Sequence, residues 1–540
     1  MNFKLFFIGL IAFSLMANAE DKRPNVIIFL VDDLGWADIS LRGAPIDTPA
    51  IDSLFSEGLT LDRFYATPIC SPTRAALMTG RDPLRLGISY SVVMPWMNNG
   101  VHPDEHFMPE SFKAAGYQTA MVGKWHLGHS QEIFHPNARG FDDFYGHMHT
   151  EVGYFPPFAN QGGIDFQRNG VTITDEGYET FLLADEASRW IKARDRERPF
   201  FLYMPFIAPH SPLEAPDDLV QKYKNLVDTR ELTRSAAIDR TRTLNGFSPS
   251  ARPMYAAVVD GLDQAIGQVL DTLANEGIEE ETIILFSSDN GGAAYAGGGA
   301  DNFPLRGGKG DTYEGGIRVI AAMKWKGKLD AGKSFESIMT VMDVFPTLAS
   351  ASRVPMLNTK EIWGRDMWPA IKSGNDIKLN KEVYFASETP NYGEFHTTVF
   401  NDKWKLVQVI TSSLLEINVE NKLFDISNDP NEYNNLADEY PKLVEIMANK
   451  IREWRALHPI SGIRAQLVPP PGWRAPKDWT SYTIPIEELQ EDASLGFGAH
   501  AHQILDYLTK DHGRIIYDCE PGDWERGKCE SPEKPSNHQH

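Results

Sequence analysis

Cysteine is scarce in this chain of 540 residues, which contains only Cys70, Cys519 and Cys529. Three cysteines are too few for a disulfide scaffold, so the fold must depend on a hydrophobic core. Cys519 and Cys529 lie close together near the carboxyl end and could pair in an oxidising compartment. Such a pair would leave Cys70 as the unpaired cysteine.

Positive charge is also in short supply, because 52 Lys and Arg face 74 Asp and Glu and give a formal net charge of −22. An acidic chain binds nucleic acid phosphates poorly, which argues against nucleic acid as a partner. An anionic substrate would have to be attracted by positive groups inside a pocket. Beyond the amino end the sequence has no apolar run long enough to span a bilayer, so we expect no stable membrane insertion.

The one long apolar run lies at the amino end, from Leu5 to Met16, after a start that includes Lys4 and before Ala17-Asn18-Ala19. A short basic start, an apolar core and a small-residue cleavage site are typical of a secretory signal peptide, whereas a membrane anchor needs a longer run. We predict a signal peptide over residues 1–19, cleavage after Ala19, and a secreted or periplasmic protein.

Several apolar runs predict strands that are buried on both faces of a mostly parallel sheet. These runs are Val26 to Val31, Gln118 to Val122, Phe200 to Met204 and Thr282 to Ser287, and helical patterns such as Tyr255 to Leu273 lie between them. Polar residues follow each run within a few positions. Because ligands gather at the carboxyl ends of parallel strands, we expect these polar residues to share one site.

The pattern changes after about Ser373, where short strand-like runs precede an amphipathic helix from Tyr440 to Leu457. We predict a catalytic domain over residues 20–375 and a C-terminal α+β subdomain over residues 376–465. From about Val468 the chain is rich in proline. We predict a C-terminal extension over residues 466–540 that either wraps the body or stays loose.

The strongest chemical signal is the segment from Thr67 to Arg81, in which Cys70, Pro72 and Arg74 form a C-x-P-x-R pattern. A lone cysteine is more often a buried free thiol than a functional group. The full segment, however, resembles the signature of type I sulfatases. This resemblance implies that a formylglycine-generating maturation enzyme converts Cys70 to formylglycine.

The chemistry explains why such a residue is useful. A plain Ser or Cys nucleophile would attack sulfur and then need a separate water to release sulfate. A hydrated aldehyde carries two hydroxyls on one carbon, so that one can attack sulfur and the other can eject sulfate as the aldehyde re-forms. The resemblance also implies an alkaline-phosphatase-like α/β fold. In this fold a large mixed, mostly parallel sheet is sandwiched by helices, and a smaller C-terminal antiparallel sheet carries a helix.

Asp32, Asp33, Asp289 and Asn290 offer only oxygen ligands, which hard cations such as Ca²⁺ and Mg²⁺ prefer. Taken singly, the first pair could cap a helix and the second could form a turn. Their position behind two buried strands favours a metal site. The sulfatase resemblance implies one Ca²⁺, with Mg²⁺ as the alternative, held by these four residues and by position 70.

Gly123-Lys-Trp-His-Leu-Gly128 resembles a second sulfatase block. In extended backbone Lys124 and His126 would face one side while Trp125 packs on the other. The resemblance assigns Lys124 to a sulfate oxygen and His126 to a formylglycine hydroxyl, where the imidazole could act as a base.

Two loops complete the predicted site. His210 lies in a Pro-His-Ser-Pro segment and Lys309 in a Gly-rich loop, so a surface histidine and a solvated lysine are the alternatives. In the family the corresponding residues lie near the bridging oxygen of the ester. Arg74 would hold the formylglycine hydroxyl and offset charge at the metal, while we assign Glu314 and Arg318 to structure.

Among sulfatases the chain resembles the N-acetylgalactosamine-4-sulfatase (arylsulfatase B) branch, for example in Arg139 to Gly146 and Phe303 to Arg306. It departs from that branch in lacking cysteine between Arg85 and Glu110, so the substrate-reading loops cannot be transferred. Three histidines in candidate specificity loops could contact sugar or could lie on the surface: His147, His149 and His396.

These patterns together predict an exported sulfatase that hydrolyses sulfate monoesters on a sulfated carbohydrate or polysaccharide. One alternative is a phosphonate or phosphodiester hydrolase of the same superfamily. The other is an inactive sulfatase-like protein that binds glycan and keeps Cys70 unmodified.

Overall fold

The computed structural model describes residues 22–156, 158–227, 251–294, 299–389, 394–412, 417–459, 469–470 and 472–485. The predicted signal peptide and the predicted Cys519–Cys529 pair lie outside these residues.

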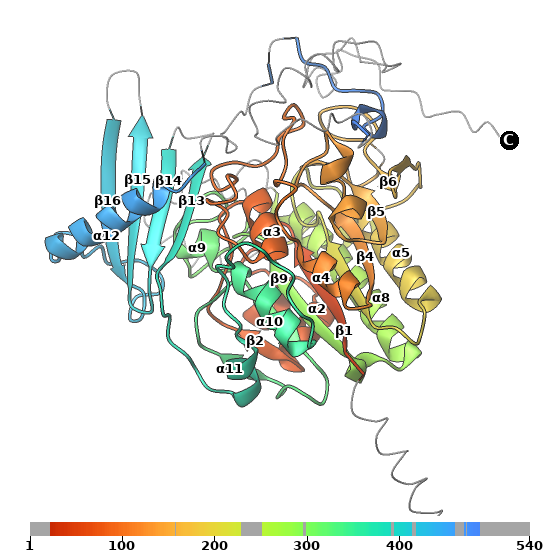
Figure 1. Ribbon diagram of the computed structural model, residues 1–540, viewed down its shortest axis with the longest axis horizontal. Helices are drawn as coiled ribbons and strands as arrows, with labels where there is room; N and C mark the ends of the chain where they lie inside the picture. Colours follow the sequence, from red (N-terminus) through yellow and green to blue (C-terminus); the bar gives the residue numbers. More distant parts are fainter. Residues whose placement is uncertain are drawn as a thin grey trace, which may run out of the picture.

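A ten-stranded sheet forms the centre of the molecule, in the order β11-β2-β10-β9-β1-β8-β4-β5-β6-β7 (Figure 1). Its five central strands, β9 to β5 in that order, pair in parallel, whereas β10, β6 and β7 pair antiparallel. The predicted large, mixed and mostly parallel sheet is therefore confirmed. Its strands are β1 (Asn25–Val31), β2 (Leu59–Leu61), β4 (Gln118–Lys124), β5 (Asp143–His147), β6 (Gln167–Arg168), β7 (Val171–Thr172), β8 (Phe200–Pro205), β9 (Thr282–Ser288), β10 (Ala321–Lys324) and β11 (Lys333–Phe335).

Helices cover both faces of this sheet, as the uninterrupted apolar runs require. In β1, Val26 and Ile28 join one hydrophobic core, whereas Ile27 and Phe29 join the other. The first core also contains residues of α3 (Cys70–Thr79), α4 (Met108–Ala114), α10 (Val344–Ala351) and α11 (Trp368–Ser373). The second contains residues of α2 (Pro49–Ser56), α5 (Glu179–Ala193), α6 (Asp217–Tyr223) and α8 (Arg252–Glu276). The short strands β3 (Phe64–Tyr65) and β12 (Met339–Thr340) pair separately, and α9 spans Glu314–Ile317.

The register of the parallel strands determines which residues meet at the carboxyl edge. Val31 of β1 lies opposite Ser288 of β9, so the residues that follow them leave the sheet side by side. Lys124 ends β4, two strands away on the other side of β8. The expectation of one shared edge is confirmed at this level.

A separate four-stranded antiparallel sheet follows in the chain, in the order β13-β14-β15-β16, and lies to one side of the main sheet (Figure 1). Val399, Leu406 and Leu423 on this sheet pack against Met447 and Ile451 of α12. The predicted small sheet with one packed helix is confirmed. Its elements are β13 (Val383–Thr389), β14 (Glu394–Phe400), β15 (Trp404–Ser412), β16 (Ile417–Asp425) and α12 (Pro441–Arg455).

Residues 472–485 of the predicted extension pack against the catalytic body (dark blue in Figure 1). Trp479 is buried, and the segment makes parallel bridges from Asp478 to Ile164 and from Ile484 to Gln131. The turn η7 (Thr480–Tyr482) lies within it. In these residues the extension wraps the body, which is one of the two predicted outcomes.

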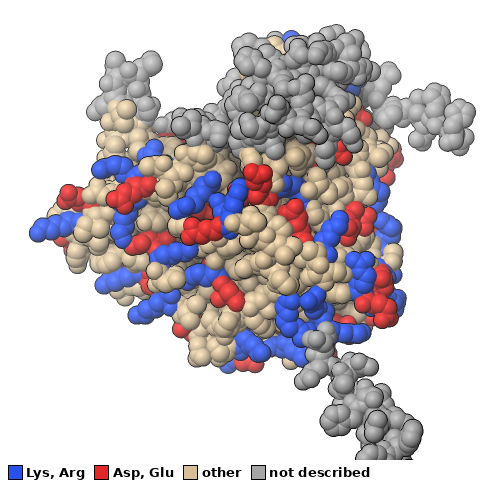
Figure 2. Space-filling model, in the orientation of Figure 1, with Lys and Arg blue, Asp and Glu red and all other residues tan. Residues whose placement is uncertain are grey.

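The face of the molecule drawn in Figure 2 carries both signs of charge in close mixture. On the described part of the face in Figure 2, Lys and Arg alternate with Asp and Glu, and neither sign forms a large patch. This face therefore offers no broad positive surface to an anionic substrate. Among the described helices none is long and apolar enough to traverse a bilayer.

Candidate functional site

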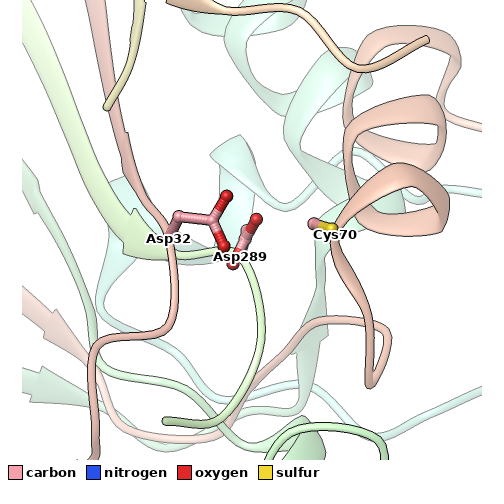
Figure 3. Close-up of side chains that lie close together, drawn as sticks. All are labelled: Asp32, Cys70 and Asp289. Atoms are coloured by element: carbon pink, nitrogen blue, oxygen red, sulfur yellow. The ribbon is translucent and has the colours of Figure 1, made fainter. Parts of the chain in front are cut away.

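Asp32, Cys70 and Asp289 meet at the carboxyl edge of the main sheet (Figure 3). One carboxylate oxygen of each aspartate and the Cys70 sulfur lie within 4.8 Å of one another, and all three residues are buried. The two aspartates meet because they follow adjacent parallel strands, β1 and β9. Cys70 is the first residue of α3, which places its sulfur in this close group.

Arg74 and Lys124 supply the positive charge around this cluster. Arg74 lies one helical turn after Cys70 on α3, which places both on one face of the helix. Its guanidinium is fully buried and lies 2.9 Å from Asp32 and 3.0 Å from Asp289. The Lys124 Nζ lies 2.6 Å from Asp32 Oδ2, and the Lys124 carbonyl accepts a further bond from Arg74 at 2.8 Å.

Asp33, His210 and Lys309 form the adjoining part of the site. The Lys309 Nζ lies 2.7 Å from Asp33 Oδ1 and 3.9 Å from Asp32. The His210 Nε2 lies 3.7 Å from Asp33 Oδ2, and oxygens of Asp32 and Asp33 with a His210 nitrogen form a second close group. Because His210 is buried and the Lys309 side chain is only 10% exposed, the alternatives of a surface histidine and a solvated lysine are wrong.

The oxygen atoms of this site fit a hard cation. Asn290 donates through Nδ2 to Asp33 Oδ1 at 2.7 Å, whereas its Oδ1 is buried without a hydrogen-bond partner among the described residues. The Oδ1 of Asp32 is buried and unpartnered in the same sense. Buried polar atoms normally have partners, so two such oxygens beside the Asp289 carboxylate are suited to binding a cation. Carboxylate and amide oxygens favour Ca²⁺ or Mg²⁺.

The pKa values of the two aspartates shift in opposite directions. Burial alone would raise the Asp32 pKa, but the charges of Lys124, His210, Lys309 and Arg74 hold it well below its usual value. Burial, followed by the charge of Asp32, raises the pKa of Asp289 to about 7. A divalent cation between the two carboxylates would favour the ionised form of both.

The chemical state of Cys70 limits what it can do unmodified. Burial raises the pKa of its thiol to about 11, although Lys124 and Lys309 act in the opposite direction. At neutral pH the side chain is therefore a neutral thiol, whereas cysteine nucleophiles act as thiolates. Unmodified Cys70 is therefore a poor nucleophile at neutral pH.

His126 reaches the site by a route that differs from the prediction. Its φ is +61°, so the backbone is left-handed there and the expectation of extended backbone through His126 is wrong. Trp125 packs away from the site against Phe107 and Phe141, as expected. The His126 Nε2 lies 3.1 Å from the Val93 carbonyl, while Nδ1 is buried without a partner among the described residues.

Electrostatics keep this imidazole neutral. Burial first, and then the charges of Lys124 and Arg74, lower the pKa of His126 well below its usual value. With the Nε2 proton donated to Val93, the lone pair of Nδ1 is left to accept a proton. The His126 side chain is thus a neutral imidazole whose Nδ1 can accept a hydrogen bond.

Two supporting residues lie outside the sequence predictions. The Ser71 hydroxyl donates to the His126 carbonyl at 2.8 Å and so joins α3 to the segment that carries His126. The Tyr154 hydroxyl donates to the His210 carbonyl at 2.8 Å. Both side chains bond backbone carbonyls, a kind of contact that leaves no sequence pattern by which it could have been found.

The histidines of the candidate specificity loops are not on the surface. His147, His149 and His396 are all buried, so the surface alternative is wrong for each. His147 lies 3.7 Å from the equally buried Glu179, and His149 packs its ring against Trp479 at 3.9 Å between centroids. The buried rings of His149 and Trp479 join the loop after β5 to the C-terminal extension.

All the site residues predicted from the sequence thus converge on one buried region, in which three lysine or arginine side chains face three aspartates. These residues are Asp32, Asp33, Cys70, Arg74, Lys124, His126, His210, Asp289, Asn290 and Lys309. Such a set can bind a hard cation and a tetrahedral anion together.

Comparison with known proteins gives the same picture. A family model described as "Sulfatase" matches residues 24–354, and one described as "N-sulphoglucosamine sulphohydrolase, C-terminal" matches residues 309–457. Arylsulfatase J of Mus musculus is 29% identical over 479 residues, covering 81% of this chain and 76% of the relative. N-acetylgalactosamine-6-sulfatase of Mus musculus is 32% identical over 401 residues, covering 69% of this chain and 71% of the relative.

A solved structure described as "Crystal structure of Ps i-CgsB in complex with k-i-k-neocarrahexaose" has the same fold, with a TM-score of 0.69. It is 29% identical and covers 81% of this chain and 94% of the other. None of these three similarities selects the N-acetylgalactosamine-4-sulfatase branch, which stays a prediction.

Proposed function

The chain belongs to the sulfatase family, has its alkaline-phosphatase-like fold and is a sulfuric ester hydrolase, and from this we infer that it removes sulfate from a carbohydrate. The observation that carries this proposal is the meeting of Asp32, Asp289 and Cys70 within 4.8 Å, next to Arg74 and Lys124. A sulfate ester is a tetrahedral anion, so it needs such a positive, preorganised cradle.

We propose that Cys70 is converted to formylglycine by a maturation enzyme before the protein acts. The Cys70 sulfur stands where the substituents of the formylglycine carbon would lie. The pKa of about 11 supports the conversion, because the unmodified thiol is a poor nucleophile at neutral pH. The position at the start of α3 supports it further, since the positive end of a helix dipole stabilises negative charge that develops there.

We propose that Asp32, Asp33, Asp289 and Asn290 hold one Ca²⁺, or Mg²⁺ in its place, next to residue 70. The unpartnered oxygens of Asp32 and Asn290 support this assignment. A formylglycine hydrate would supply the attacking hydroxyl, and the cation would polarise that hydroxyl and a sulfate oxygen.

The remaining side chains bind the anion and move protons. Lys124 and Arg74 lie beside the Asp32 carboxylate and are the groups we assign to a sulfate oxygen and to the hydroxyl at position 70. His126, neutral and with Nδ1 available, would take the proton of the second hydroxyl as sulfate is eliminated and the aldehyde re-forms.

Departure of the alcohol needs a donor at the bridging oxygen. The His210 Nδ1 bonds the Ser211 carbonyl, and burial lowers the pKa of this imidazole. Neutral His210 with its proton on Nδ1 has none to give through Nε2. We therefore assign the donor role to Lys309 and a binding role at the same oxygen to His210.

The substrate class and the location rest on sequence and relatives. The mouse relative is named for N-acetylgalactosamine 6-sulfate chemistry, and the solved structure holds a neocarrahexaose. We propose a sulfated glycan as the substrate and, from the signal-like amino end, export to the periplasm or outside the cell.

The function is tested by measuring sulfate and phosphate release from matched esters. The panel contains N-acetylgalactosamine 4- and 6-sulfate, a neocarrahexaose, 4-nitrophenyl sulfate and the corresponding phosphate ester. We expect sulfate release that is lost on chelation and restored by calcium. Faster phosphate release would identify the phosphoesterase alternative, and glycan binding without turnover would identify the inactive alternative.

Asp289→Asn and Asp263→Asn form a matched pair for this assay. Both aspartates are buried, and burial raises the pKa of each to about 7. Asp263 accepts the backbone N–H groups of Ala50 and Ile51 and takes no part in the site. Only Asp289→Asn should abolish sulfate release; equal losses in both variants would contradict the site.

A further inference from the structure

The loop that carries Lys309 is held by hydrogen bonds and an ion pair from the C-terminal sheet and the segment that follows it. Its last residues form α9, which lies next to the four-stranded sheet in Figure 1. Lys309 belongs to the catalytic body, whereas the side chains that hold its loop come from β13, β15 and the segment after β16, about eighty to one hundred and twenty residues later in the chain. The contacts fall at two points, Gly310 and Glu314, which both follow Lys309 in the chain.

The first point is Gly310, the residue after Lys309. The Ser387 hydroxyl, fully buried on β13, donates to the Gly310 carbonyl. The Gly310 N–H in turn donates to the Pro68 carbonyl at 2.8 Å, two residues before Cys70. The peptide next to Lys309 is thus held between the C-terminal sheet and the segment that presents the nucleophile.

The second point is Glu314, where α9 begins. The Lys405 Nζ lies 2.9 Å from Glu314 and 2.9 Å from Glu432, and all three side chains are fully buried. Glu432 also accepts the Glu314 N–H at 2.7 Å. A buried triad of this kind fixes a geometry, because a displaced member would leave an unpaired charge away from water.

The first turn of α9 packs too closely against the Lys309 loop for either to shift alone. A Cβ on Gly315 would lie 2.5 Å from the Arg306 carbonyl oxygen and 2.6 Å from that of Gly307. A Cβ on Gly316 would lie 2.0 Å from the Asp311 carbonyl oxygen. The chain therefore crosses itself at van der Waals contact, so a movement at Glu314 displaces the peptide that carries Lys309.

We propose that Ser387, Lys405 and Glu432 are positioning residues for Lys309, and that the C-terminal sheet thereby sets how well the leaving alcohol is assisted. This inference rests on the proposed donor role of Lys309. Such a donor matters little for an alcohol that leaves easily and greatly for one that leaves poorly. Removing the contacts of Ser387 or Glu432 should therefore change how strongly the rate depends on the leaving group, as well as the rate itself.

The experiment measures kcat/KM and kcat for aryl sulfates whose phenols span a range of acidity, from 4-nitrophenyl to 4-methoxyphenyl sulfate. The positioning variants are Ser387→Ala and Glu432→Gln, and Lys309→Ala is the reference. Thr398→Val is the matched control, because the Thr398 hydroxyl is equally buried and donates to the Leu406 carbonyl at 2.8 Å within the same sheet.

We expect Ser387→Ala and Glu432→Gln to lose roughly ten- to a hundredfold in kcat on the poorest leaving group but less than about threefold on 4-nitrophenyl sulfate. Lys309→Ala should show the same trend more steeply, and Thr398→Val none. An even loss across the series, or the same trend in Thr398→Val, would overturn the positioning role. If Lys309→Ala shows no trend, both the donor role of Lys309 and the positioning role are overturned. If Lys309→Ala shows the trend and the positioning variants do not, only the positioning role is overturned.

Discussion

Replacing Arg74 by methionine perturbs the charge balance at the centre of the site. The fully buried guanidinium lies 2.9 Å from Asp32, 3.0 Å from Asp289 and 2.8 Å from the Lys124 carbonyl. Methionine keeps the length of the side chain but leaves both carboxylates without this cation. Removing one member of a buried ion pair costs about 3–5 kcal/mol, and the two pairs share one guanidinium, so their costs do not add.

Calcium should reduce this cost, because it would neutralise the same two carboxylates. A ligand present at a hundred times its Kd stabilises the native state by about 2.7 kcal/mol. In the Arg74→Met variant the stabilisation should be larger than in the wild type, since a positive neighbour of the cation is gone. We therefore expect the loss of unfolding free energy to be clearly larger in chelator than in saturating calcium.

The assay is denaturant unfolding of the wild type and variant, followed by tryptophan fluorescence, with chelator or with calcium. Arg168→Met is the control. Arg168 also pairs with a buried carboxylate, that of Glu186, but its own side chain is 38% exposed. Pairs of this kind contribute below about 1 kcal/mol and should not respond to calcium. Two results would refute the idea that Arg74 and calcium neutralise the same carboxylates. One is an Arg74→Met protein as stable as the wild type in chelator, and the other is a loss of unfolding free energy that calcium leaves unchanged.

Three further outcomes follow from the same structure. Lys405→Met should lower the unfolding free energy by about 3–5 kcal/mol, because two buried carboxylates lose their cation. Lys403→Met is the control, because its side chain is 54% exposed and its loss should cost less than about 1 kcal/mol. Equal denaturation midpoints for the two variants would contradict the prediction. Trp479→Ala empties a buried site and should loosen residues 472–485 at a local cost of about 3–5 kcal/mol; unchanged rates of limited proteolysis there would count against it. His126→Gln should lower kcat by about 10²- to 10⁴-fold, and His135→Gln, also buried, should not; a kcat assay that finds the two variants alike would remove His126 as the base.

The central sheet and the position of the site could be predicted because they depend on local pattern and one topological rule. Uninterrupted apolar runs require burial on both faces, and polar residues that follow parallel strands must meet at one edge. The register of Val31 opposite Ser288 brings Asp32 and Asp289 together in this way. Cys70 and Arg74 meet because residues four apart share a helix face.

What could not be predicted depends on contacts between distant segments. The left-handed backbone at His126 has no clear signal in the residue itself, because only a few per cent of residues other than glycine take that conformation. The burial of His149 results from the return of the chain at Trp479, more than three hundred residues later. Ser387 donates to a backbone carbonyl, an acceptor that every residue offers, so no pattern identifies its partner.

The chemical identity of residue 70 in the active protein decides whether the proposed mechanism operates. Trypsin releases the peptide Phe64–Arg74, whose mass differs between a cysteine and an aldehyde at that position. Preparations made with increasing amounts of a formylglycine-generating enzyme would be compared by aldehyde fraction and by specific activity. We predict that activity rises in proportion to the aldehyde fraction and extrapolates to zero without it; full activity in protein that carries only the cysteine mass would contradict the mechanism.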